Sequence, residues 1–86
     1  RRKVISERER VTSQLEAMNF DVLPSAANFV LARHRQRLAE DLALLLREQG
    51  IIVRHFSKPR IDQYLRVTIG TEDQNNLLIE NLQKIL

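Results

Sequence analysis

The stretch that decides the fold is Tyr64-Leu65-Arg66-Val67-Thr68-Ile69-Gly70-Thr71, an apolar segment with one arginine that runs directly into a helix start. Successive side chains of a strand point to opposite faces of a sheet, so positions 65, 67 and 69 would form a buried face. Arg66 would then project from the opposite face together with Tyr64 and Thr68. The pattern predicts a strand that presents one positive charge on its polar side.

The residues that follow this strand predict the last helix. Thr71-Glu72-Asp73-Gln74 matches a capping box, in which the threonine side chain and the glutamine side chain each satisfy a free backbone N–H. Leucines at 78 and 82 and the isoleucine at 85 then form one apolar stripe.

The residues before it predict four further elements. A stripe of apolar residues predicts a helix over residues 1–19, and Pro24 separates it from a first strand over residues 26–32. Leucines spaced by three and four predict a helix over residues 35–49, which Gly50 would end. The β-branched run at 51–56 predicts a second strand, and Pro59 in the short connection 57–60 predicts a hairpin with the Arg66 strand.

The expected order of elements is therefore α-β-α-β-β-α, an α+β fold with two layers. A strand-helix-strand unit favours parallel strands, and the third strand fits antiparallel between them. We expect a three-stranded sheet of order 1-3-2, with the helices on one face and Arg66 on the central strand. The other face would be left for a partner.

Size and composition limit what this chain does. With 86 residues it forms one domain with a thin core. Its net charge of +3 comes from 14 basic and 11 acidic residues that are interleaved, which favours a solvated surface over a nucleic-acid interface. No segment reaches the roughly 20 apolar residues of a membrane span. The absence of cysteine fits a reducing compartment, and the start at Arg1-Arg2-Lys3 reads as a cut end.

Few residues are candidates for chemistry. His34 and His55 have no adjacent ligand at metal spacing, and the two glycines are isolated rather than part of a phosphate-binding loop. Arg66 either stays solvated or binds an anion. The second alternative is open because a planar guanidinium can donate two parallel hydrogen bonds to a carboxylate or phosphate. Arg54 ends the neighbouring strand, so it either converges with Arg66 on one dianion or points to the opposite face. Taken alone, the chain does not predict a catalytic site.

Three blocks of the sequence, taken together, carry a family resemblance. Residues 22–31 (VLPSAANFVL), 50–56 (GIIVRHF) and 64–71 (YLRVTIGT) resemble, in order and spacing, the carboxy-terminal small domain of histidinol-phosphate aminotransferases. These belong to the fold type I transferases that depend on pyridoxal phosphate. The resemblance implies that residues 1–86 are the small domain of a larger enzyme, whose large cofactor-binding domain lies outside this chain.

The resemblance also implies an activity and its partners. The full-length protein would be a cytoplasmic homodimer that moves an amino group from histidinol phosphate to 2-oxoglutarate in histidine biosynthesis, with pyridoxal phosphate as the electron sink. The lysine that binds the cofactor is not matched by Lys3, Lys58 or Lys84, so the isolated fragment is expected to be inactive and to bind no cofactor. Arg66 and, beside it, Arg54 would bind the substrate anion.

A different class of function is also open. A free-standing ferredoxin-like module could bind an effector or RNA on an open sheet face without being an enzyme. A large α/β region encoded upstream would favour the aminotransferase.

Overall fold

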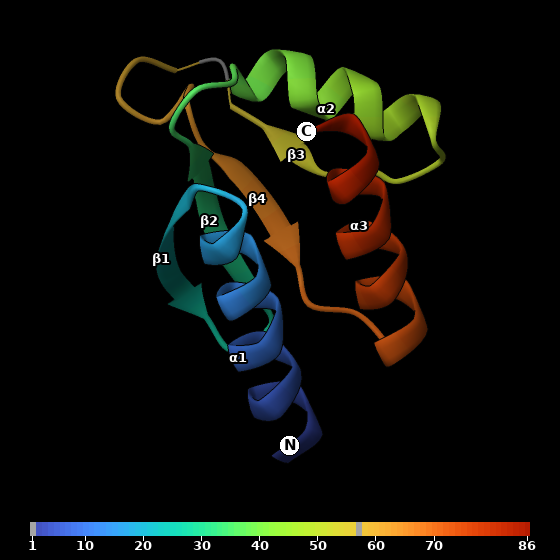
Figure 1. Cartoon of the computed structure of the whole chain (residues 1–86). Helices are drawn as coiled ribbons and strands as arrows, with labels where there is room; N and C mark the ends of the chain where they lie inside the picture. The colour runs from blue at the N-terminus through green and yellow to red at the C-terminus, as the bar shows by residue number, and fades with distance from the viewer. Residues whose placement is uncertain (1, 57) are drawn as a thin grey trace.

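Three helices and four strands make up the part of the chain that the computed structural model describes, residues 2–56 and 58–86. The elements follow the order α1 (Arg2–Ala17), β1 (Phe20–Ala26), β2 (Phe29–His34), α2 (Ala39–Glu48), β3 (Arg54–His55), β4 (Leu65–Thr68) and α3 (Glu72–Ile85). They form two layers, with the helices in front of a twisted sheet (Figure 1). The expected helix start at Arg1 and the expected connection residue Ser57 lie outside the described residues.

The sheet has four strands in the order β1-β2-β4-β3, so the prediction of a three-stranded sheet was wrong. The missed strand is β1, which pairs antiparallel with β2 at the edge of the sheet. Pro24 is a break signal in the sequence, but a proline is tolerated on an edge strand, where one row of backbone N–H groups needs no partner. The chain order is therefore α-β-β-α-β-β-α. Within the sheet, the three expected strands do lie in the order first, third, second.

All three predicted strands have different bounds in the structure, and the one expected at 64–70 covers only Leu65–Thr68. The expected strand at 26–32 becomes β2, which starts at Phe29 because Ala27 and Asn28 form the turn of the β1–β2 hairpin. The expected strand at 51–56 shortens to Arg54–His55. It still pairs antiparallel with β4, as the predicted hairpin requires.

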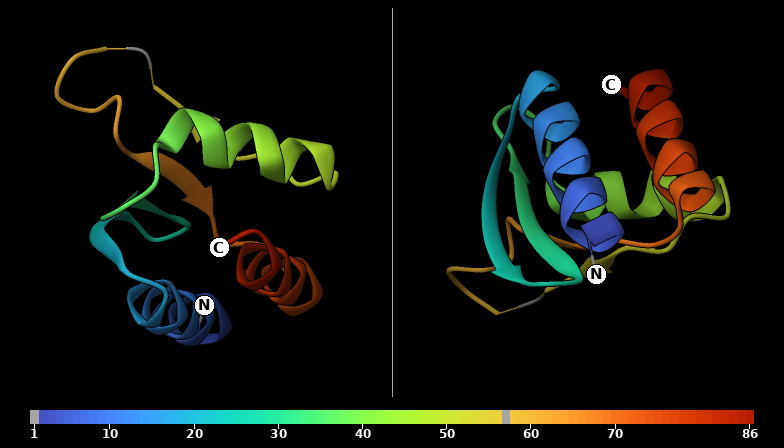
Figure 2. Two further views of the ribbon diagram at one scale, coloured as in Figure 1. Left: turned by 45° about the horizontal axis from the view of Figure 1, so that its top comes forward. Right: turned by 90° about the horizontal axis from the view of Figure 1, so that it is seen from below.

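The helices cover one face of the sheet (Figure 2). The apolar side chains on that face are buried. Strand β4 shows the predicted alternation, with Leu65 and Val67 each 2% exposed and Arg66 and Thr68 on the other side. The buried hydrophobic residues form a single core cluster, made up of Val11, Leu15, Phe20, Val30, Ala32, Ala39, Leu42, Leu46, Leu65, Val67, Ile69, Leu78, Ile79 and Leu82. The side of the sheet opposite the helices carries Arg66, and we call it the open face.

Helix α3 begins as the sequence predicts. The Thr71 hydroxyl accepts from the backbone N–H of Gln74 at 3.2 Å, and the Gln74 side chain accepts from the N–H of Thr71 at 2.9 Å. This reciprocal capping box fixes the point where the chain leaves β4. None of the helices in the described residues is long and apolar enough to span a membrane.

Candidate functional site

Arg66 lies on β4, an interior strand hydrogen-bonded to β2 on one side and β3 on the other. Its two neighbours along the chain are buried in the core, so the backbone beneath the guanidinium is held on both flanks. Within the described residues, no hydrogen bond or ion pair to the Arg66 side chain is found. Its guanidinium carbon lies 4.9 Å from the centre of the Phe29 ring.

Arg54 shares the open face with Arg66. The two residues are direct cross-strand partners in the antiparallel β3–β4 pair. Side chains of such partners leave the same face of a sheet, with their Cβ atoms about 5 Å apart. The register therefore decides the alternative that the sequence left open, since Arg54 does not point to the opposite face.

The two arginines line one open groove of about 700 Å³ together with Thr68. Glu40 and Asp41 of α2 also line this groove, but no ion pair joins them to either arginine within the described residues. Two unneutralised cations side by side repel each other, so an anion bound between them would relieve the repulsion.

Three other arginines, in contrast, are paired with carboxylates. Asp21 accepts from Arg33 at 2.9 Å and from Arg35 at 3.1 Å, and these hydrogen bonds lower the pKa of the Asp21 carboxyl. Arg10 pairs with Glu7 at 2.8 Å. Arg54 and Arg66 therefore differ from these three in keeping their N–H donors free of carboxylates within the described part of the chain.

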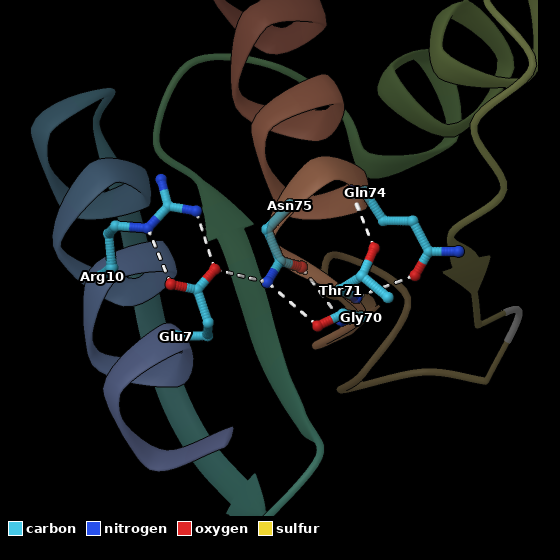
Figure 3. A network of polar contacts seen from close by, with 6 residues as sticks. All are labelled: Glu7, Arg10, Gly70, Thr71, Gln74 and Asn75. Atoms are coloured by element: carbon cyan, nitrogen blue, oxygen red, sulfur yellow. Dashed lines mark hydrogen bonds and ion pairs between the residues drawn. The ribbon is translucent and has the colours of Figure 1, made fainter. Parts of the chain in front are cut away.

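A polar network holds the end of β4 in place (Figure 3). The Asn75 side chain accepts from the Gly70 N–H at 2.9 Å and donates to the Gly70 carbonyl at 3.2 Å. It also donates to Glu7 of α1 at 3.0 Å. Glu7 is only 7% exposed, and hydrogen bonds from Arg10 and Asn75 lower its pKa to about 2.

The sequence does not predict this network. Its two partners are far apart in the chain, because Asn75 directly follows the capping box and Glu7 lies in a charged stretch 68 residues away. The network ties α1 to the turn that follows the Arg66 strand.

The two histidines make structural contacts. His34 packs edge-on against the Phe20 ring at 4.9 Å and accepts from the N–H of Gln36 at 3.1 Å, while burial lowers its pKa. The Nε2 atom of His55 lies 3.0 Å from the Asp62 carbonyl. Among residues 2–56 and 58–86, no group of three or more potential ligands could hold a metal ion.

The lysines do not fit a pyridoxal phosphate site. Lys3 lies on α1, Lys58 on the β3–β4 connection and Lys84 on α3, and all three are exposed. A covalent cofactor site needs a lysine inside a pocket with donors for the phosphate. The described residues of this chain offer no such combination.

Comparison with known proteins assigns the family. Residues 1–82 match the model of the family described as aminotransferase class I and II. The chain belongs to this aminotransferase family. That match covers nearly the whole chain, and it does not favour a free-standing ferredoxin-like module.

The chain is similar to several histidinol-phosphate aminotransferases. It is 58% identical over 81 residues to that of Acinetobacter baylyi, covering 94% of this chain and 22% of the relative. It is 59% identical to that of Pseudomonas putida, covering 94% of this chain and 23% of the relative. The chain thus spans less than a quarter of the length of these two aminotransferases.

Solved aminotransferases share its fold. The histidinol-phosphate aminotransferase from Clostridium acetobutylicum superposes with a TM-score of 0.82 at 27% identity, over 93% of this chain and 25% of that one. A decarboxylase from Sulfurospirillum multivorans superposes with a TM-score of 0.78 at 30% identity, over 94% of this chain and 24% of that one. The fold of this chain is therefore found in both an aminotransferase and a decarboxylase.

Proposed function

We propose that this chain is the substrate-binding C-terminal domain of a pyridoxal phosphate-dependent aminotransferase that uses histidinol phosphate as amino donor and 2-oxoglutarate as acceptor. The observation that carries the proposal is the Arg54–Arg66 cross-strand pair on the open face, which lacks a carboxylate partner within the described residues. The names of the relatives at 58–59% identity support the choice of substrate.

In this proposal Arg66 binds the anionic end of each substrate. A phosphate dianion suits two arginines, because each guanidinium can donate two parallel hydrogen bonds to its oxygens. A carboxylate of 2-oxoglutarate can occupy the same place in the other half of the reaction. Arg54 adds the second positive charge from the neighbouring strand.

The cofactor and its lysine belong to the remainder of the protein in this proposal. Pyridoxal phosphate supplies an electron sink that stabilises negative charge on the substrate carbon. A solved histidinol-phosphate aminotransferase from Sinorhizobium meliloti, which at 20% identity shares the fold with a TM-score of 0.76, is described as a complex with this cofactor. The residues of this chain bind and orient the substrate instead.

The proposal also places this domain within the full-length protein. The open face packs toward the large domain of the same protein, so that the bound substrate lies between the two. We place the full-length enzyme in the cytoplasm as a homodimer. Isolated, this chain should bind no pyridoxal phosphate, and mixing the two should produce no cofactor absorbance shift that depends on Lys58.

Removal of Arg66 tests the proposal in the full-length enzyme. Arg66→Ala should lower kcat/KM for histidinol phosphate about 100-fold or more, since a lost charge-assisted contact costs about 3 kcal/mol. Arg35→Ala is a matched control, because the donors of Arg35 are taken by Asp21, and it should stay within about twofold of wild type. A loss below fivefold for Arg66→Ala would remove this residue from the substrate site.

A further inference from the structure

Phe29 is the one described aromatic residue found with its ring under the Arg66 guanidinium. The guanidinium carbon lies 4.9 Å from the ring centre, within the range of a cation–π contact. Phe29 lies on β2 directly opposite Thr68, which places it on the open face and diagonal to Arg66. Both residues are partly buried. The contact thus joins two interior strands across the face that carries the arginine pair.

An aromatic ring and a carboxylate hold a guanidinium in different ways. Asp21 binds Arg33 and Arg35 through their N–H groups and so occupies the donors that an external anion would need. The face of a ring attracts the positive charge through its electron density, whereas a carboxylate takes up N–H donors as hydrogen bonds. Arg66 can therefore be oriented by Phe29 while its donors stay free for a ligand.

The contact also limits the freedom of a long side chain. An arginine on a solvated sheet face samples many rotamers, and their loss on binding opposes affinity. A ring beneath the guanidinium favours one plane for the fork before any ligand arrives. The positions of the ring and the guanidinium are then fixed by β2 and β4, which are rigid elements of the sheet.

We propose that Phe29 is a positioning residue for substrate binding, whose ring orients the Arg66 guanidinium and leaves its N–H groups free for the anionic end of the substrate. This inference depends on the proposed function, because it assigns Phe29 a role only through Arg66. It makes the electron density of the ring, beyond its size, a determinant of catalytic efficiency.

A fluorine series at position 29 of the full-length enzyme separates these two properties. Phenylalanines with one, two and three fluorines keep nearly the same shape, while each fluorine weakens the negative face of the ring. We expect kcat/KM for both substrates to fall stepwise, by about tenfold in total for the trifluorinated ring. The thermal midpoint should stay unchanged across the series.

Phe20 provides the matched control. It is a core phenylalanine, 2% exposed, on the neighbouring strand β1. The same fluorine series at position 20 should leave kcat/KM unchanged. A parallel fall at both positions would mean a general effect on the fold and would overturn the proposal.

The outcomes distinguish this inference from the proposed function. If the series at position 29 is flat while Arg66→Ala still costs about 100-fold, Phe29 only packs and the inference fails alone. If Arg66→Ala has no effect, the proposed function itself fails. Phe29→Leu adds a second measurement, because it keeps an apolar side chain and should match or exceed the loss of the trifluorinated ring.

Discussion

Asn75 is the residue whose removal best tests the structure of the β4–α3 turn. It is 2% exposed, and its side chain makes three hydrogen bonds, two with Gly70 and one with Glu7. Asn75→Ala removes all three and leaves the Gly70 N–H without this acceptor. A hydrogen bond between neutral groups contributes about 1 kcal/mol net, so the two bonds with Gly70 alone predict a loss of about 2 kcal/mol. The bond to the Glu7 carboxylate adds to this loss.

Hydrogen exchange in the full-length protein measures this loss locally. A loss of about 2 kcal/mol corresponds to about a 30-fold increase in exchange. We expect that increase at the amides of Gly70 and Asn75, which donate to the Asn75 side chain and to the Thr71 carbonyl in the wild type. Asn76→Ala is the matched control, since no side-chain hydrogen bond of Asn76 is found within the described residues. An increase below threefold for Asn75→Ala would refute the reasoning.

Asn75→Asp makes the same test sensitive to charge. An aspartate keeps the size of the side chain and can still accept from Gly70, but it cannot donate to Glu7 and brings a second carboxylate within hydrogen-bond distance of it. We expect exchange near pH 7 to be faster than in Asn75→Ala. Slower exchange than in the alanine variant at that pH would contradict the assigned geometry.

The structure makes three further predictions. Because the pKa of Glu7 falls from 4.5 to about 2 on folding, the ionised Glu7 stabilises the protein above pH 4.5, and this stabilisation is lost as the pH falls toward 2. The thermal midpoints of wild type and Glu7→Gln should therefore converge as the pH is lowered over that range. A difference between the two midpoints that does not change with pH would contradict this prediction. Thr71→Ala should destabilise helix α3 by about 1 kcal/mol while Thr71→Ser does not, as measured by exchange of the first-turn amides. Gly50→Ala should lower the free energy of unfolding by about 1 kcal/mol through backbone strain alone, because Gly50 has a φ of +80° and an added Cβ meets nothing within 4 Å. Gly50→Asn should lower it by less. A loss for Gly50→Asn that equals or exceeds the loss for Gly50→Ala would contradict the strain argument.

Much of the fold was predictable because its signals are local. The three helices follow from apolar stripes with a period of 3.6, and the start of α3 follows from a four-residue capping box. The alternation in β4 predicted which face Arg66 would occupy, and the structure confirmed it. Strand β1 was missed because Pro24 is a break signal in most settings and becomes harmless only at the edge of a sheet.

The candidate site was predictable only in part. The type of residue and the polar side of the strand identified Arg66, and spacing alone left the direction of Arg54 open. The register between β3 and β4 decided that direction. Neither the Phe29 contact nor the Glu7–Asn75 bond had a usable signal, since their partners lie 37 and 68 residues apart in the chain.

The amino-acid sequence by itself determined most elements of this protein and the polar side of strand β4 on which Arg66 lies. Hydrogen bonds within a helix and the alternation of side chains along a strand involve residues only a few positions apart, so each element can be predicted from its own segment of the sequence. The tertiary structure alone decided which side chains meet. Cross-strand register and burial depend on partners from distant segments, and these brought Arg54, Arg66 and Phe29 to one open face.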